Sequence, residues 1–393
     1  MKVEKTRLFF PALLAAAAVL AGLAVGFSPP SQPSPAYLAD ARELLAGGVI
    51  ASDFEKVGYP IFLWAGLTLG GMAGIYLGQA GLYLGTVALS WFLLRRTGVS
   101  RRWALGTAAL VALHPVLLLN ITRVVDSGLS VFLLLCLSAA LLRTPASGWI
   151  RAGAAGVLAG ITWLTRPNYV LILALIPLEE VKSRLPRARR LLCLAATGAA
   201  ALGTAALLTW WACGKVRLMT TDGNYALFTG ANPWTARMLL AHGHTEGYTP
   251  QILTRMGIDP ERPDIDRVYR ELSLDFIRRH PLRYLGFGVL KVVNVFRPDY
   301  SRLAVSTTVS LPWALAIFQT ILALPFPVWA AVRMRRGKAV GWRSPLRAGL
   351  FLLLFILPLF IYSSSCRYRL PFDVLLILDT ARTLYLTRRG VGT

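Results

Sequence analysis

Apolar runs of about 20 residues recur along this chain, and most of its charged residues fall between them. A helix of that length crosses the hydrocarbon core of a bilayer. Only 16% of the 393 residues are charged and 55% are hydrophobic, whereas about a quarter of an average soluble domain is charged. This composition excludes most soluble enzymes and nearly all disordered proteins. Despite the net charge of +23, no nucleic-acid partner is expected, because the charges lie between the apolar runs.

The apolar runs predict an all-α integral membrane protein with about ten transmembrane helices. Residues 149–181 are interrupted by Thr165, Arg166, Pro167 and Asn168, so this stretch is either two short helices or one kinked span. The ten expected helices cover residues 8–27, 71–94, 103–119, 125–142, 149–164, 167–181, 191–212, 308–332, 346–362 and 371–387.

Basic residues in the short loops predict the orientation, since Lys and Arg near a span stay on the cytoplasmic side. With the amino terminus inside, the inner segments hold 22 basic and three acidic residues, whereas the first outer loop, 28–60, holds two basic and four acidic. Both termini are therefore predicted to be cytoplasmic, and the first apolar run is expected to be an uncleaved span rather than a signal peptide. The expected location is a bacterial inner membrane, which the chain crosses many times.

Two outer segments, loop 28–60 and residues 213–307, are longer than simple connections, and the second of them divides the chain into three parts. Residues 1–212 form an amino-terminal membrane module that includes loop 28–60, residues 213–307 an outer subdomain, and residues 308–393 a second membrane module. Within the first loop, residues 36–48 predict a short interfacial helix with Tyr37, Leu38, Ala41, Leu44 and Leu45 toward the membrane surface. Residues 58–71 predict a further helix at or dipping into the outer interface, and residues 276–298 are again amphipathic.

Four arginines fall at the predicted outer face, against the usual bias: Arg123, Arg166, Arg367 and Arg369. Guanidinium groups hold phosphate or pyrophosphate bidentately, so the set predicts a site for an anionic ligand. The alternative for each arginine is snorkelling to lipid headgroups or pairing with an acid of a loop.

Acidic residues on the same side provide candidates for a general base or a metal ligand. Asp40 lies on the first-loop helix, Asp53 follows it, and Asp126 stands where the chain enters the fourth span. For Asp53 a solvated surface charge is the favoured reading, and for Asp126 a helix cap is the alternative. The stretch HGHTE, 242–246, matches no compact metal motif and predicts a flexible loop. Cys213 and Cys366 both fall at outer ends of spans, where a disulfide between them would need an oxidising compartment.

Several segments, in this order and on this side of the membrane, resemble the GT-C superfamily of polytopic glycosyltransferases. The resemblance covers most of the chain and is greatest to the bacterial branch related to protein mannosyltransferases and lipid A aminoarabinose transferases. It rests on Tyr37, Ala41, Tyr59 and Pro60 in the first loop, and on HPVLLLNITRVVDS (114–127), WLTRPNYVLIL (163–173), NYALFTGANPWTAR (224–237), FIRRHPLRYLGFGVLKVVNVFRP (276–298) and RYRLPFDVLLIL (367–378).

The resemblance implies transfer of a sugar, with inversion at its anomeric carbon, from a polyprenyl-phosphate carrier to a glycan, lipid or protein acceptor of the cell envelope. It assigns the first-loop acid as catalytic base and the acid at the fourth span as a second active-site carboxylate. It also implies substrate contacts from Tyr37, Arg123 and Arg166, and stabilisation of the leaving phosphate by the late basic residues Lys291, Arg367 and Arg369. Asp126 would orient the acceptor or a divalent cation.

The sequence departs from the family at the first-loop acid. The family's aspartate usually stands three to five residues before the tyrosine, where this chain has Gln32, Pro33 and Ser34. Asp40 replaces it, or Asp53 does, or the protein binds the carrier without the usual chemistry. Two other classes therefore stay open: a transporter or flippase for a lipid-linked saccharide, and a non-catalytic protein of envelope assembly.

Overall fold

The described part of the chain is helical throughout. The computed structural model describes residues 9–27, 35–50, 56–122, 124–141, 148–167, 186–216, 218, 222–242, 249–296, 324–336, 356–358, 360–362 and 370–390, and no strand occurs among them. The helices are α2 (Phe9–Phe27), α3 (Pro35–Leu45), α4 (Gly58–Arg96), α5 (Arg101–Ala112), α6 (Pro115–Thr122), α7 (Ser127–Leu141), α8 (Gly148–Thr165), α11 (Arg187–Cys213), α12 (Asp222–Gly230), α13 (Thr235–His242), α14 (Thr249–Arg255), α15 (Ile265–Arg279), α16 (Pro281–Phe296), α18 (Pro325–Arg336) and α20 (Leu370–Arg388).

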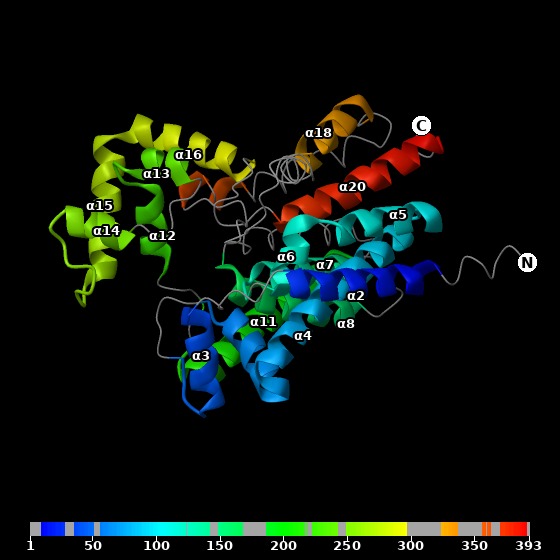
Figure 1. Cartoon of the computed structure of the whole chain (residues 1–393), viewed down its shortest axis with the longest axis horizontal. Coiled ribbons are helices and arrows are strands. Elements are labelled where there is room, and N and C mark those ends of the chain that lie inside the picture. Colours follow the sequence, from blue (N-terminus) through cyan, green and yellow to red (C-terminus); the bar gives the residue numbers. More distant parts are fainter. Residues whose placement is uncertain are drawn as a thin grey trace, which may run out of the picture.

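Figure 1 shows these helices in two groups, a bundle and a lobe. The bundle holds α2 to α8, α11, α18 and α20, with α3 packed on α4, and the lobe holds α12 to α16. The beginning of α2 and the end of α20 lie at the end of the bundle that is farther from the lobe (Figure 1). The lobe corresponds to the expected outer subdomain, and it has its own apolar core, in which Phe228 of α12 packs with Met238, Leu253 and Tyr269.

Helix α4 folds back on itself at two glycines. Gly71 has φ +61° and ψ −142°, a conformation that glycine alone adopts readily, and Gly70 is also non-helical. The two arms then run antiparallel in close contact, since a Cβ added at Gly74 would lie 2.1 Å from the carbonyl oxygen of Gly66. The helix predicted over 58–71 is therefore present as the first arm, and the second arm supplies the expected span at 71–94.

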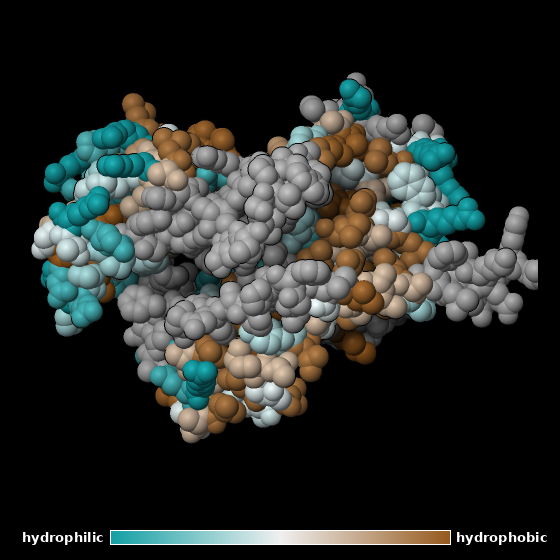
Figure 2. All heavy atoms as spheres, in the orientation of Figure 1, coloured by the Kyte–Doolittle hydropathy of each residue, from teal (hydrophilic) through white to brown (hydrophobic). Residues whose placement is uncertain are grey.

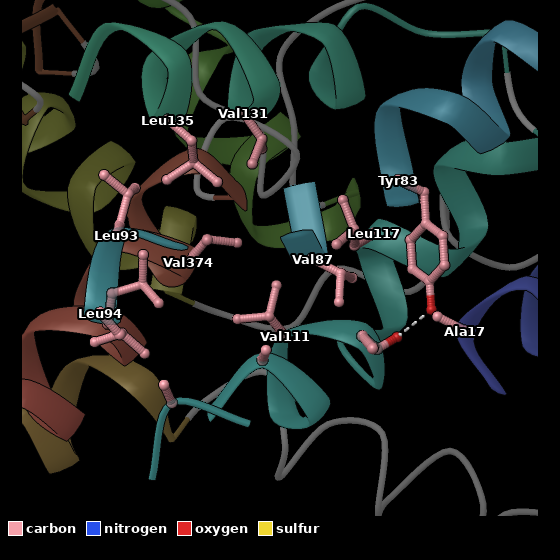
Figure 3. Packing of buried hydrophobic residues seen from close by; sticks show 14 of the residues in the cluster. Ala17, Tyr83, Val87, Leu93, Leu94, Val111, Leu117, Val131, Leu135 and Val374 are labelled. Atoms are coloured by element: carbon pink, nitrogen blue, oxygen red, sulfur yellow. Dashed lines mark hydrogen bonds between the residues drawn. The ribbon is translucent and has the colours of Figure 1, made fainter. Parts of the chain in front are cut away.

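The bundle core joins α2, the second arm of α4, α5, α6, α7 and α20. Val87 and Val111 lie at its centre, and the Tyr83 hydroxyl donates a hydrogen bond of 2.9 Å to the carbonyl oxygen of Ala112 (Figure 3). This hydrogen bond, and the short connection of residues 97–100, make the second arm of α4 and α5 antiparallel neighbours. Close packing of these apolar side chains holds the bundle together in the described residues.

Small residues let α8 and α11 pack backbone to backbone. A Cβ at Gly156 would lie 2.5 Å from the carbonyl oxygen of Thr197, and one at Gly160 would lie 2.6 Å from that of Ala201. Such small residues at four-residue spacing are typical of tightly packed helices in membranes. Because the contact moves four residues along both helices, from Gly156 and Thr197 to Gly160 and Ala201, α8 and α11 run parallel.

The polarity of the helices follows one pattern across the bundle. Ring contacts join Phe10 to Trp91 and Trp103 to Tyr385 at one end. At the other end His114 meets Asp373, and Asp126 meets Arg166. These four contacts make α2 and α5 run in one direction, and the second arm of α4, α7 and α20 run in the opposite direction.

Two sequence predictions about helices need correction. The span expected over 103–119 is two helices, α5 and α6, with Leu113 and His114 outside both, because Pro115 lacks the N–H that a continuous helix would use. The face of α3 that carries Leu38, Ala41 and Leu44 is buried against α4 and its neighbours rather than turned to a membrane surface, and Leu45 is exposed.

Two described helices, α4 and α11, are long and apolar enough to cross a membrane, and Phe10–Gly22 and Ser127–Leu141 are shorter apolar segments. Helix α8 ends at Thr165, so the described part of the 149–181 stretch is one helix. The predicted span 167–181, and most of those at 308–332 and 346–362, lie outside the described residues.

Candidate functional site

A buried ion pair joins α7 and α8 at the bundle end nearer the lobe. The guanidinium of Arg166 donates to both carboxylate oxygens of Asp126, from Nε to Oδ2 at 2.9 Å and from Nη2 to Oδ1 at 2.6 Å. Its Nη2 also donates to the Ser127 hydroxyl oxygen at 3.0 Å. Both charged side chains are almost fully buried, so each depends on the other for its stability.

Local sequence explains why these two residues meet. Asp126 directly precedes α7, and Arg166 directly follows α8. Helices α7 and α8 are antiparallel neighbours, with Leu137 packed near Ala155 and Ala159. The start of α7 therefore lies beside the end of α8, which brings Asp126 next to Arg166. Both residues are among the candidates from the sequence, and the structure brings them together.

The first-loop segment adds a second cation, Lys56, and a tyrosine, Tyr59, to this pair. The Lys56 Nζ lies 3.6 Å from Asp126 Oδ2. Tyr59, fully buried, is within electrostatic range of Asp126, and its hydroxyl oxygen accepts a 2.7 Å hydrogen bond from the Gln79 side-chain amide. We call Lys56, Tyr59, Asp126, Ser127 and Arg166 the outer-end cluster.

Gly58 permits this approach of α4 to the end of α8. A Cβ at Gly58 would lie 2.7 Å from the backbone nitrogen of Thr165, closer than real side chains come. The absence of a side chain there lets Lys56 and Tyr59 come near the residue that follows Thr165, which is Arg166.

Helix α3 places Tyr37 and Asp40 next to this region. The Tyr37 ring meets the Tyr59 ring edge to face, with centroids 5.2 Å apart. Asp40 is buried, one helical turn after Tyr37 and one turn before the buried Leu44. A carboxylate is costly to bury, which makes Asp40 a candidate for chemistry.

Lys291 forms a separate site, where the lobe meets residues 356–362. Its fully buried Nζ donates to the carbonyl oxygens of Ile361 at 3.0 Å and Gly230 at 3.3 Å, and it lies 5.2 Å from the centroid of the Tyr284 ring. The Tyr284 hydroxyl donates to the same Ile361 carbonyl. Burial lowers the pKa of Lys291 from 10.5 to about 7, because the uncharged amine is easier to desolvate.

A buried histidine and carboxylate, which the sequence analysis did not identify as a pair, link two of its motifs. His114 Nε2 lies 3.6 Å from Asp373 Oδ2, and both side chains are buried. The signal in the sequence was a polar residue in each of two apolar motifs, His114 in HPVLLLNIT and Asp373 in LPFDVLLIL. The two motifs belong to spans that are expected to run in opposite directions, so both residues were expected near the same face of the membrane. Spacing along the chain could not show that the two spans are neighbours.

The other sequence candidates are not placed. Asp53, Arg123, Arg367 and Arg369 lie outside the described residues, as do His244, Glu246 and Cys366, so the disulfide between Cys213 and Cys366 stays a prediction. Among the described residues no three His, Cys, Asp or Glu side chains gather where they could hold a metal ion. The role of a divalent cation therefore also stays a prediction.

Comparison with known proteins adds no assignment to this geometry: no protein-family model, no curated protein and no solved structure matches the chain.

Proposed function

We propose that this chain is a multi-pass protein of a bacterial inner membrane and an inverting glycosyltransferase of the GT-C type. It would take a sugar from a polyprenyl-phosphate carrier and transfer it to an envelope acceptor on the outer face. The observation that carries the proposal is the outer-end cluster: the buried Asp126–Arg166 ion pair and the half-buried Lys56, gathered from the first loop, α7 and α8 at the bundle end nearer the lobe.

The membrane placement is supported by α11. It begins with Arg187, Arg189 and Arg190 and ends with Trp210 and Trp211, both of which are exposed. Basic residues at one end and tryptophans at the other are typical of a spanning helix, and the 27 residues of α11 extend about 40 Å, enough to cross the core with some tilt.

The ten-span topology is supported by the directions in which the bundle helices described above run. Arg95, Arg96, Arg101, Arg102 and Arg388 lie at the bundle end farther from the lobe, where Trp103 meets Tyr385. The outer-end cluster lies at the opposite end. This separation matches the inner and outer faces that the basic residues predict. The parallel directions of α8 and α11 agree with the prediction of one further span, 167–181, between these two helices in the sequence.

The proposed reaction divides the work among the candidate residues. Asp40 takes the proton of an acceptor hydroxyl or amine as that oxygen or nitrogen bonds to the anomeric carbon. The bond from that carbon to the carrier phosphate oxygen breaks, and the phosphate leaves with the electron pair. Lys291 in its protonated form, with Arg367 and Arg369, would balance the charge that develops on the leaving phosphate.

Asp126 has a positioning role in this proposal rather than that of the base. Both of its oxygens already accept hydrogen bonds from Arg166, which makes it a weak acceptor for a further proton. The pair instead holds Arg166 and Lys56 in place, and these cations would help bind the anionic donor together with Arg123. Tyr37 would contact the sugar, and Asp53 is the second candidate for the base.

The test is release of polyprenyl phosphate from labelled polyprenyl-phosphate hexoses and pentoses, with purified protein and an envelope extract as acceptor. Wild type is expected to release it and Asp40→Asn is expected to lose release with donor binding retained. Asp275→Asn is the control, because Asp275 is an exposed acid of α15 that pairs with Arg279 at the surface.

Each outcome decides between functions. Equal release by wild type and Asp40→Asn would support the glycosyltransferase but contradict Asp40 as its base. Asp53→Asn would then be the next variant to test. Saturable donor binding by wild type without release of any donor would contradict the enzyme and favour a lipid-saccharide transporter or an assembly protein.

A further inference from the structure

Helix α16 leaves one apolar side uncovered. Leu282 is 81% exposed, Leu285 50%, Val289 59% and Val293 59%. These residues recur every three or four positions, so they form one stripe along the helix. The opposite side carries Lys291, Phe287 and Val295, all buried. We call Leu282, Leu285, Val289 and Val293 the α16 stripe.

The surroundings of the stripe differ at its two ends. Figure 2 shows hydrophobic atoms along the edge of the lobe over α16, beside the hydrophilic surface of α15. Near the first end lie three exposed arginines, Arg278, Arg279 and Arg283. At the far end, Val295 packs with Phe372 and Leu376 of α20 and with Trp329 of α18, so α16 runs from the polar lobe onto the apolar bundle.

The composition of the stripe favours lipid over a protein partner. It consists of leucine and valine alone, whereas the centre of a protein interface is enriched in Trp, Tyr, Met and Arg. From Leu282 to Val293 the helix rises about 16 Å, close to half the thickness of a bilayer core. Arginines at one end of such a length fit the phosphates of lipid headgroups, and the apolar stripe fits the acyl chains below them.

We propose that α16 seats the lobe on the outer leaflet, with the α16 stripe among acyl chains, Arg279 and Arg283 at the headgroup phosphates, and the Val293 end deeper than the Leu282 end. This inference rests on the membrane placement in the proposed function. It gives the lobe a fixed height over the membrane, because the face of α16 opposite the stripe holds Lys291 against Ile361.

The experiment uses the full chain with its native cysteines replaced, in nanodiscs of phosphatidylglycerol and phosphatidylcholine. A single cysteine carrying an environment-sensitive fluorophore is placed at Val289, and its emission is measured with brominated phosphatidylcholine or with aqueous iodide. Leu274→Cys on the polar helix α15, 37% exposed, is the control for water, and Leu207→Cys on α11, 66% exposed, is the control for lipid.

The Val289 label is expected to lose most of its emission to brominated lipid and little to iodide, like the Leu207 label and unlike the Leu274 label. With bromine at increasing depth along the acyl chain, the strongest quenching is expected to move from Leu282→Cys to Val293→Cys.

Four results would overturn the inference or its premise. Iodide quenching of the Val289 label equal to that of Leu274 would contradict a lipid contact. Protection from both quenchers, with crosslinks between copies at position 289, would assign the stripe to a second chain instead. Failure of lipid quenching at Leu207 would contradict the membrane placement itself, whereas quenching at Leu207 without quenching at Val289 would contradict only the seating of α16.

Discussion

Buried charges distinguish this molecule from an apolar bundle, and two of the sites that hold them have different kinds of neighbour. Asp126 and Arg166 satisfy each other, and Lys291 is satisfied by backbone carbonyl oxygens of Gly230 and Ile361. A carbonyl cannot neutralise an ammonium group as a carboxylate can. The two sites should therefore respond differently to mutation and to pH.

Removing one partner of the Asp126–Arg166 pair should be more harmful than removing both. Asp126→Asn leaves the Arg166 guanidinium buried without its counter-ion, and we expect a loss of about 3–5 kcal/mol in the free energy of unfolding. The double variant Asp126→Asn with Arg166→Met should recover part of that loss. Thermal or denaturant unfolding in detergent measures both.

The matched control is the ion pair of Arg267 with Glu271 on α15, which is exposed on both sides. Glu271→Gln should leave the free energy of unfolding almost unchanged, because surface pairs contribute little. Additive effects of the two substitutions at Asp126 and Arg166 would contradict the coupling between these residues.

Stability should depend on pH through Lys291. Its folded pKa is about 7, below the usual lysine value of about 10.4 in the unfolded chain. Between these values the unfolded state binds more protons, so the Lys291 contribution to stability increases as the pH rises from about 7. Lys291→Met removes this dependence, and unfolding of both proteins from pH 6 to pH 9, about the range set by that pKa, checks it.

Binding of the donor should have the opposite dependence on pH, since only the protonated amine attracts a phosphate. We expect donor affinity of the wild type to fall as the pH rises through about 7. A binding curve that falls equally for wild type and Lys291→Met would assign the titration to another group.

At the scale of elements, glycines decide how closely helices approach. Gly74 faces Gly66 within α4, Gly58 faces the end of α8, and Gly156 and Gly160 face α11. In each case the atom nearest to the position of an added Cβ belongs to the backbone of the neighbouring segment. Backbone cannot move aside as a flexible side chain does. The first two contacts position the first-loop segment of the outer-end cluster.

Gly74→Ala should therefore open the fold-back of α4. The added methyl group would meet the Gly66 carbonyl oxygen, and we expect a cost of at least about 1–3 kcal/mol, as for overpacking of a core. Gly81→Ala in the same helix meets nothing within 4 Å and should be neutral or slightly stabilising, because alanine favours helix. The free energy of unfolding is measured for both variants, with donor binding as a second measurement. Equal stability of the two variants would contradict the close contact between the two arms of α4.

At the scale of the molecule, the lobe and the chain termini should lie on opposite sides of the membrane. Single cysteines at Glu261, in the exposed turn before α15, and at Arg389, after α20, test this in cells whose outer envelope has been made permeable. An impermeant thiol reagent should label position 261 in intact cells and position 389 only after lysis. Labelling of both positions in intact cells would contradict the proposed topology.

Much of the helical structure follows from local sequence. Apolar runs with basic flanks predicted α2, α7, α8, α11 and α20 to within a few residues, because helix formation and apolar burial depend on neighbouring residues. The break at His114 was missed, since Pro115 is also tolerated inside membrane helices when neighbours satisfy the freed backbone groups.

For the candidate site, local composition already marks Asp40, Asp126, Arg166 and Lys291 as charges in or beside apolar segments, where a charge is costly. The neighbours of these charges depend on the three-dimensional fold. It pairs Asp126 with Arg166, buries Asp40 on α3 and places Lys291 against two carbonyl groups. Such contacts join residues tens of positions apart, and they depend on which helices are neighbours, which the close approaches at Gly58, Gly74 and Gly156 set.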